Sequence, residues 1–291
     1  MQVPAPFEYE RATSVDQALG LLERYGPEAR LLAGGHSLLP MMKLRLARPD
    51  VLIDINDLAD LSYVRVESQE LCIGAMTRHR ELLESTVAGE HFAILHDAER
   101  VIADPIVRNR GTIGGSICQA DPSEDLSAVF AALKATAVIR SSSTTRVVPM
   151  DDFHLGAYST AVGPAEILVE VRVPIRSGSG SSYQKVERRV GDWAIVAAGA
   201  QLVLEGDRVA DAGIGLAAVG AEHFRAAAAE SSLQGAVAGE ESFAAAARLA
   251  AESCQPVSDQ RGPADYKRHL AGELTLRALR TAAARARGEE A

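Results

Sequence analysis

Two adjacent glycines early in the chain impose the strongest local constraint on its fold. A short apolar segment at Ala29–Leu32, suited to a strand, leads directly into Ala33-Gly34-Gly35-His36-Ser37, and a helix-capable apolar run continues to Leu46. With almost no side chain at the first three of these positions, a ligand can lie against the backbone. Glycine also permits the positive φ angles that turn successive N–H groups toward one point, and a helix that starts there adds unpaired N–H groups of its own. The segment therefore predicts either a loop that holds a phosphate or pyrophosphate or a tight turn without a ligand.

A second pair of glycines follows about eighty residues later, in the turn-like stretch Thr112-Ile113-Gly114-Gly115-Ser116. The acids and serine of Ala120–Leu126, just beyond it, suit the first turn of a helix that continues through Leu133. One glycine pair is a weak signal. Two glycine–hydroxyl segments at this separation predict two sides of one large, phosphate-containing ligand.

Composition narrows the class of protein. The 291 residues allow about two domains, and 47% hydrophobic with 24% charged residues is typical of a globular protein. The net charge of −9 and the lack of a long basic run argue against nucleic-acid binding. No apolar run approaches the roughly 20 residues of a membrane span. The first six residues carry no secretory signal pattern, so we expect the cytoplasm.

Cysteine and histidine spacing argues against a metal site. The three cysteines, Cys72, Cys118 and Cys254, lie far apart and form no C-x-x-C pair, and the seven histidines show no H-E-x-x-H spacing. A zinc or iron–sulfur site therefore lacks its ligand pattern, and we expect the cysteines to be buried apolar residues. His79 and His91 are expected at the surface or at helix ends.

The apolar periodicity predicts an α+β fold. Residues 1–57 form a small α/β unit around the first glycine pair, with a helix after Thr13-Ser14 and a buried strand at Val51–Ile55. The next unit combines helices, including one from about His91 to Ala103, with strands at 63–66, 71–75, 136–140, 146–148 and 168–173. Ser177–Ser182 is predicted to be a flexible boundary. Three antiparallel strands, two alanine-rich helices and a long final helix then follow it.

Four motifs together resemble one known family. They are Ala33–Lys43, Thr112–Gly115, Asp121–Asp125 and Gly191-Asp192-Trp193-Ala194, in this order. The chain resembles the FAD-binding medium subunits of the molybdenum hydroxylases, above all those of carbon monoxide dehydrogenase; xanthine dehydrogenase carries the same module. Ser258–Tyr266 also matches the carbon monoxide dehydrogenase branch, and the resemblance extends from Phe7 to about Arg285.

The resemblance implies a two-part FAD-binding domain of the vanillyl-alcohol-oxidase (PCMH) type at residues 1–176, with subdomains of about 1–57 and 58–176. A C-terminal domain at 183–287, made of a three-stranded antiparallel sheet with a helical bundle, would follow. It also implies a set of FAD-binding positions, with no catalytic and no metal-binding residue in this chain. These positions are Ala33, Gly34, Gly35, His36, Ser37, Ile102, Thr112, Ile113, Gly114, Gly115, Ser116, Asp125, Leu168, Lys185 and Trp193.

Individual roles follow from the same resemblance. Asp125 matches an acid that contacts FAD hydroxyls; its alternative role is to stabilise a helix N-terminus. Lys185 matches a lysine near the flavin, where a positive charge would raise the flavin potential; alternatively it is a solvated strand residue. Trp193, the only tryptophan, matches an aromatic ring that covers one flavin face, and its alternative is a core or interface position. Ser116 stands where relatives often carry asparagine.

The implied function is electron transfer within a complex. A large subunit would hold a molybdenum–pterin cofactor, a small subunit two [2Fe–2S] clusters, and the FAD of this chain would pass electrons to quinone, NAD or oxygen. A cytoplasmic dimer of heterotrimers is expected, with association to a membrane through the complex left open. The alternatives are a stand-alone FAD-dependent oxidase or dehydrogenase of the same fold, and a non-redox nucleotide-binding or scaffold subunit.

Overall fold

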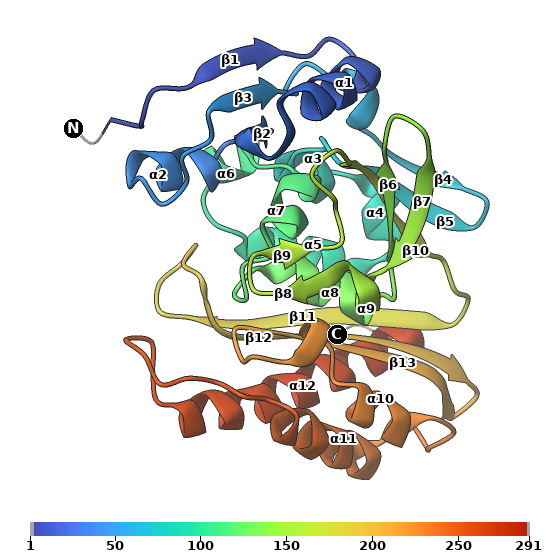
Figure 1. The fold of residues 1–291 in the computed structure, drawn as a ribbon. Coiled ribbons are helices and arrows are strands. Elements are labelled where there is room, and N and C mark those ends of the chain that lie inside the picture. The colour runs from blue at the N-terminus through green and yellow to red at the C-terminus, as the bar shows by residue number, and fades with distance from the viewer. Residues whose placement is uncertain (1–2, 290–291) are drawn as a thin grey trace.

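The first layer of the fold is a small parallel sheet at the N-terminal end (Figure 1). The structure is a computed structural model and describes residues 3–289. The strands lie in the order β1-β3-β2, and both neighbouring pairs are parallel. The elements of this layer are β1 (Glu8–Arg11), α1 (Val15–Tyr25), η1 (Gly26–Glu28), β2 (Ala29–Leu32), α2 (Leu38–Lys43) and β3 (Val51–Asp54).

Helix α1 starts at the capping box that the sequence predicts. The Ser14 hydroxyl accepts a hydrogen bond from the Gln17 N–H at 3.1 Å, and the Gln17 side chain accepts one from the Thr13 N–H at 2.7 Å. Leu19 and Leu22 share one face of the helix and are buried against the sheet. Strand β1 was not predicted: Glu8–Arg11 is mostly polar and exposed, so its sequence lacks a strand pattern.

The second layer is a five-stranded antiparallel sheet in the order β4-β5-β10-β6-β7. Its strands are β4 (Val64–Glu67), β5 (Glu70–Gly74), β6 (Thr136–Arg140), β7 (Thr145–Pro149) and β10 (Ile167–Pro174). Most helices of this layer lie between β5 and β6 in the chain. They are α3 (His79–Leu83), α4 (Thr86–His91), α5 (Ala93–Val101), α6 (Pro105–Arg110), α7 (Ile113–Gln119) and α8 (Asp125–Ala132), with η2 (Ala59–Leu61) before β4 and α9 (Met150–Phe153), β8 (His154–Gly156) and β9 (Ser159–Thr160) before β10.

The third layer is an antiparallel sheet in the order β11-β12-β13 with helices on its outer side (Figure 1). Its elements are β11 (Ser179–Glu187), β12 (Ala194–Glu205), β13 (Arg208–Ala217), η3 (Glu222–Phe224), α10 (Ala227–Leu233), α11 (Glu240–Glu252) and α12 (Ala264–Ala286). The predicted α+β fold, with a three-stranded sheet and a helical bundle at the C-terminal end, is confirmed.

One sequence-based expectation about the chain after β10 is wrong. The serine- and glycine-rich stretch Ser177–Ser182 is not a flexible linker, because β11 begins at Ser179 and the side chains of Ser181 and Ser182 are buried. Gly180 lies so close to α12 that a Cβ there would collide with the carbonyl oxygen of Ala282. The small residues therefore serve close packing. The helix expected from about His91 to Ala103 is present as α5 (Ala93–Val101), two residues shorter at each end, and the separate helix α4 ends before it at His91.

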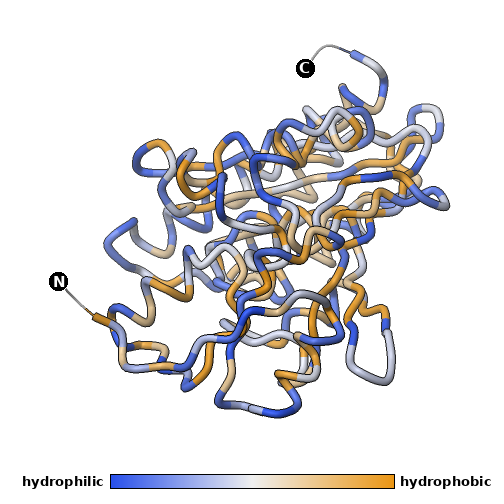
Figure 2. The backbone as a smooth tube through the Cα atoms, turned by 90° about the horizontal axis from the view of Figure 1, so that it is seen from above, coloured by the Kyte–Doolittle hydropathy of each residue, from blue (hydrophilic) through white to orange (hydrophobic). Residues whose placement is uncertain are grey.

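Helix α8 joins the second layer to the third. Every one of its eight residues is buried, and its backbone lies directly on β13. A Cβ at Gly213 or Gly215 would collide with the carbonyl oxygens of Ala132 and Ala128. The hydropathy colouring in Figure 2 shows hydrophobic stretches in the inner strands and hydrophilic ones at many outer loops. Asp125 is the first residue of this fully buried helix, so the packing of α8 fixes the position of Asp125 in the cavity described below.

None of the helices in residues 3–289 combines the length and the apolar character of a membrane span. In the same residues, no three His, Cys, Asp or Glu side chains form a group that could hold a metal ion. Cys72 and Cys254 are buried, and Cys118 is partly buried. Burial raises the pKa of Cys118 to about 12.

Candidate cofactor site

A cavity of about 860 Å³ opens between the three layers. Its volume lies within the range of roughly 300–1,000 Å³ that ligand sites occupy. Segments that are far apart in the sequence meet in its wall. All the predicted FAD-binding positions except Ile113 line it: Ala33, Gly34, Gly35, His36, Ser37, Ile102, Thr112, Gly114, Gly115, Ser116, Asp125, Leu168, Lys185 and Trp193.

The first glycine segment, residues 33–37, lines the cavity. Within residues 3–289, the N–H groups of Gly34, Gly35, His36 and Ser37 have no hydrogen-bond acceptor. Gly35 has a φ of +81°, which an L side chain rarely adopts, and Ser37 makes no capping bond at the start of α2. Unpaired N–H groups beside a cavity are a binding site for an anion. The structure supports the loop prediction over a closed turn.

The second glycine segment, residues 112–116, is built differently. The sequence predicts a turn, but residues 113–119 form α7 and Thr112 is its N-cap. Its N–H groups are used within the protein: Gly114 donates to Ala75 O at 2.8 Å, and Gly115 donates to Thr112 Oγ1 at 3.1 Å. Its glycines therefore allow close packing and leave a smooth surface toward the cavity. The unpaired N–H groups of the cavity wall described above lie in the first segment.

Ile113 is the one predicted position that lies outside the cavity wall. Its side chain is fully buried in the main hydrophobic core, and its N–H donates to the carbonyl oxygen of Thr77 at 2.9 Å. It anchors the second glycine segment from behind.

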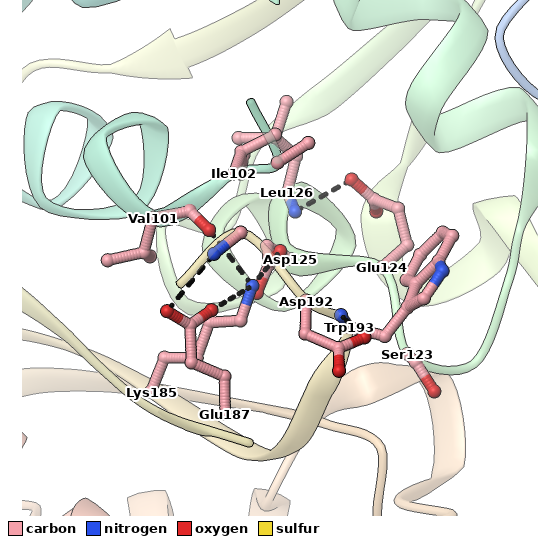
Figure 3. A network of polar contacts seen from close by, with 12 residues as sticks. Val101, Ile102, Ser123, Glu124, Asp125, Leu126, Lys185, Glu187, Asp192 and Trp193 are labelled. Atoms are coloured by element: carbon pink, nitrogen blue, oxygen red, sulfur yellow. Dashed lines mark hydrogen bonds and ion pairs between the residues drawn. The ribbon is translucent and has the colours of Figure 1, made fainter. Parts of the chain in front are cut away.

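Asp125 and Lys185 form a buried ion pair in the cavity wall (Figure 3). Lys185 Nζ lies 2.9 Å from Asp125 Oδ2 and 3.1 Å from the carbonyl oxygen of Val101, and Tyr183 OH donates to Asp125 Oδ1 at 2.7 Å. Glu187 Oε2 lies 3.7 Å from the same Nζ. The Lys185 side chain is only 2% exposed. It is therefore not a solvated strand lysine, and its charge is largely balanced by that of Asp125.

Burial and pairing act in opposite directions on this aspartate. Burial raises the pKa of the Asp125 carboxyl, while the ammonium of Lys185 and the hydroxyl of Tyr183 oppose that rise. Burial also raises the pKa of Tyr183 well above its usual value, so its hydroxyl stays a hydrogen-bond donor. Asp125 is thus a hydrogen-bond acceptor in the cavity wall, and its negative charge is partly balanced by Lys185.

Apolar residues complete the wall near this pair. Ile102 is the C-cap that follows α5 and is 7% exposed, while Leu168 of β10 is 4% exposed. Trp193 is 44% exposed and follows Gly191, which lies so close to Ala103 that a Cβ would crowd its carbonyl oxygen. Trp193 is thus not a core residue; it stands in a loop at the cavity, with its ring accessible.

Ser116 is half-buried in the cavity wall and is hydrogen-bonded to a chain of buried polar groups. Its hydroxyl donates to Glu124 Oε1 at 2.9 Å, and the other Glu124 oxygen accepts from the N–H of Ser127 at 2.6 Å. Ser127 Oγ lies 3.1 Å from His154 Nε2. Glu124 caps α8, so the Ser116 side chain supports the helix that carries Asp125.

His79 is the main residue of the cavity wall that sequence reasoning missed. It was expected at the surface or a helix end; it is the first residue of α3, but its side chain is only 4% exposed, with Nδ1 3.1 Å from both oxygens of the fully buried Glu99. Burial disfavours the imidazolium, but the Glu99 carboxylate outweighs it and raises the pKa of His79. Neither residue stands in a motif, so the sequence gives no signal for the pair. Contact between α3 and α5 alone creates it.

These features fit FAD. The free N–H groups of residues 34–37 suit a pyrophosphate, since they offer several donors to one anion. The Asp125 carboxylate provides an acceptor for hydroxyl groups, and the apolar side chains with Trp193 suit a flat aromatic ring. The wall includes residues from the N-terminal layer to β11, and the volume of about 860 Å³ leaves room for a large ligand such as a dinucleotide.

Comparisons with known proteins agree with this description. Residues 5–176 match the family described as "FAD binding domain in molybdopterin dehydrogenase", and residues 181–282 match the "CO dehydrogenase flavoprotein C-terminal domain". The carbon monoxide dehydrogenase medium chain of Hydrogenophaga pseudoflava is 42% identical over 97% of this chain and 99% of its own. The glyceraldehyde dehydrogenase medium chain of Sulfolobus acidocaldarius is 36% identical over 96% and 99%.

A solved structure shares the whole fold. In carbon monoxide dehydrogenase from Hydrogenophaga pseudoflava, one chain superimposes with a TM-score of 0.94 at 44% identity, covering 97% of this chain and 99% of that one. The chain therefore belongs to the FAD-binding flavoprotein subunits of the molybdopterin dehydrogenases, the oxidoreductase family that includes the medium chain of carbon monoxide dehydrogenase.

Proposed function

We propose that this chain is the FAD-carrying electron-transfer subunit of a molybdenum hydroxylase complex. Bound FAD supplies redox chemistry that accepts and releases electrons. The observation that carries the proposal is the set of unpaired N–H groups at residues 34–37, which open on a dinucleotide-sized cavity. Successive backbone N–H groups without protein acceptors form a site that suits an anionic ligand.

We propose a separate task for each part of the cavity wall. Residues 33–37 bind the pyrophosphate, and the smooth surface of residues 112–116 lets the ligand lie close to α7. Asp125 accepts hydrogen bonds from FAD hydroxyls. Lys185 holds Asp125 in place and adds the positive end of a buried dipole. Ile102, Leu168 and Trp193 exclude water from the flavin end of the site.

Electrons would arrive from [2Fe–2S] clusters of a small partner subunit and leave to an external acceptor. Relatives named medium chain or subunit support a place within a larger complex. We propose a large molybdenum–pterin subunit and a small iron–sulfur subunit as partners, two copies of each trimer, and a cytoplasmic location. The relatives act on different substrates, carbon monoxide and glyceraldehyde among them, so substrate choice would lie with the large subunit.

Absorbance spectroscopy of purified protein tests this proposal. The chain should carry about one FAD, and substrate should reduce that FAD only when both partner subunits are present. A flavin-containing chain that oxidises a substrate alone, with multiple turnovers, would instead support a stand-alone oxidase or dehydrogenase. A folded chain that takes up no flavin would leave only a non-redox role.

A further inference from the structure

The side chain of Asn56 lies between the two glycine segments of the cavity. Its Nδ2 donates to the carbonyl oxygen of Ala33 at 2.7 Å and to Asp54 Oδ1 at 2.7 Å. Its Oδ1 accepts from Arg78 Nη2 at 2.9 Å and from Arg110 Nη2 at 3.3 Å. One planar amide thus connects the first segment with the residues that flank the second.

Arg78 continues this connection to the second glycine segment. Its Nη1 donates to the carbonyl oxygen of Arg110, which directly precedes Gly111 and Thr112. The backbone of Arg78 also forms a bridge with Thr112. We call the side chains of Asn56 and Arg78, with the two carbonyl groups that they hold, the Asn56 clamp. Neither side chain lines the cavity, so the clamp acts through the segments that do.

The first glycine segment has few other attachments. Within residues 3–289, the only side chain that donates to the carbonyl oxygens of residues 33–37 is Asn56, and the remaining bonds to them run from Leu39 and Met41 of the following helix. The N–H groups of residues 34–37 have no protein partner. Because the N–H groups of this segment are unpaired and Gly35 is in the left-handed region, contacts from outside the segment are needed to maintain its conformation.

The backbones of the two segments also touch beside the clamp. A Cβ added to Gly34 would collide with the carbonyl oxygen of Arg110 and the Cα of Gly111. The clamp and this contact together fix how far apart the segments stand. The distance between them sets the width of the cavity where the pyrophosphate would lie.

The chemistry of the position requires an amide. Nδ2 faces three acceptors, the third being the carbonyl oxygen of Leu32 at 3.4 Å, and Oδ1 faces two guanidinium groups. An aspartate at this position would still accept hydrogen bonds from the two guanidinium groups. It would, however, place an oxygen against the carbonyl oxygen of Ala33 and the carboxylate of Asp54. Burial and the nearby Arg110 lower the pKa of Arg78, which still stays protonated because an arginine starts far above neutral pH.

We propose that the Asn56 clamp is the positioning device of the FAD pyrophosphate site: it holds the first glycine segment at a fixed distance from the second and thereby sets FAD affinity. The inference rests on the proposed function. Loss of the clamp leaves the core of each layer intact but lets residues 33–37 sample other shapes. FAD then binds to a smaller fraction of molecules, and its apparent dissociation constant rises in proportion.

The test measures FAD dissociation constants of the deflavinated full chain by fluorescence titration. Asn56→Ala, Asn56→Asp and Arg78→Met should each weaken FAD binding at least tenfold, and ADP should compete less well by the same factor. The visible bands of bound FAD should stay unchanged, because the clamp lies away from Asp125, Lys185 and Trp193. The matched control is Arg140→Gln, which removes the 2.5 Å ion pair to Asp16 between the first two layers, away from the cavity. This control should bind FAD within twofold of the unchanged chain.

A double-mutant cycle separates a clamp from general loss of structure. Asn56→Ala and Arg78→Met should be strongly non-additive in FAD affinity, whereas Asn56→Ala and Arg140→Gln should be additive. If Asn56→Ala does not fold, Asn56→Gln, with the same groups one methylene further out, replaces it and should also bind FAD at least tenfold more weakly. FAD binding within twofold of the unchanged chain in a folded Asn56 variant, or additivity between Asn56 and Arg78, would overturn the inference. An unchanged chain that binds no FAD would contradict the proposed function instead.

Discussion

Lys185 Nζ lies 2.9 Å from Asp125 Oδ2 in a part of the cavity wall where both side chains are almost completely buried. The two residues were expected as separate contacts to the cofactor, one anionic and one cationic. As a pair they act as a dipole, which is weaker at a distance than an isolated charge. Their positions on α8 and β11 also tie the second layer to the third.

Breaking this pair should destabilise the protein more than removing it. Asp125→Asn leaves the buried ammonium with only the more distant Glu187 carboxylate, 3.7 Å away, as a counter-charge. Breaking a buried pair in this way typically costs about 3–5 kcal/mol, whereas the double variant Asp125→Asn with Lys185→Met should recover most of that loss. Urea unfolding of the three proteins measures the difference. A double variant no more stable than Asp125→Asn would show that the pairing carries little of the stability.

The contact of Gly34 with the backbone of Arg110 predicts a specific loss. Gly34→Ala should push the two glycine segments apart and lower FAD affinity at least tenfold, because the neighbouring atoms belong to the backbone and cannot rotate away. Gly20→Ala is the control, since a Cβ at this position of α1 meets no atom within 4 Å. Alanine there should raise helix stability by about 0.5–1 kcal/mol and leave FAD binding unchanged. Titration with FAD compares the two, and equal affinity would contradict the contact argument.

The single tryptophan offers a direct reporter. Trp193 lines the cavity and is 44% exposed, so FAD added to the deflavinated chain should quench most of its fluorescence. Trp193→Phe should keep FAD affinity within a few-fold, while Trp193→Ala should lose the stacking contribution of about 0.5–1.5 kcal/mol and bind roughly two- to tenfold more weakly. Tryptophan emission that does not respond to saturating FAD would place the flavin elsewhere.

Stability should fall in mild acid because of His154. Burial lowers the pKa of this histidine to about 4, and its Nδ1 has no hydrogen-bond partner within residues 3–289. Between about pH 6.5 and 4 the unfolded chain therefore binds a proton that the folded chain does not. The contribution of neutral His154 to the free energy of unfolding is fully present above about pH 6.5. It decreases as the pH falls, by up to about 1.4 kcal/mol per pH unit and by about 3 kcal/mol in all.

The variant His154→Gln isolates this effect. The free energies of unfolding of both proteins, measured in urea at pH 7, 6 and 5, should converge or cross as the pH falls, because only the unchanged chain carries the histidine. A difference between them that is independent of pH would exclude His154 as the source.

The sequence was informative where function depends on short segments. The glycine pairs, the acid at the start of α8 and the tryptophan after β11 are local features, and the cavity collects all but one of the residues chosen from them. Ile113 differs because, as the first residue of helix α7, it lies on the face of the helix that packs on the core, while its neighbours Gly114 and Gly115 line the cavity. Because the sequence predicted a turn here, it gave no helix face to these residues and so did not show which of them would be buried.

Long-range contacts account for what the sequence did not provide. His79 and Glu99 come together because α3 packs on α5, and Asn56 reaches Arg78 only when the first two layers meet. Strand β1 exists because β3 offers it a parallel edge, and Ser179–Ser182 becomes a strand because α12 covers it. Composition suggested flexibility there, but tertiary packing overrides local propensity.

Binding of FAD in the cavity between the layers is measured by a stoichiometric titration of the deflavinated full chain. We expect saturation at one FAD per chain, with quenching of Trp193 emission at the same equivalence point. A folded chain whose absorbance and emission stay unchanged by a large excess of FAD would contradict it.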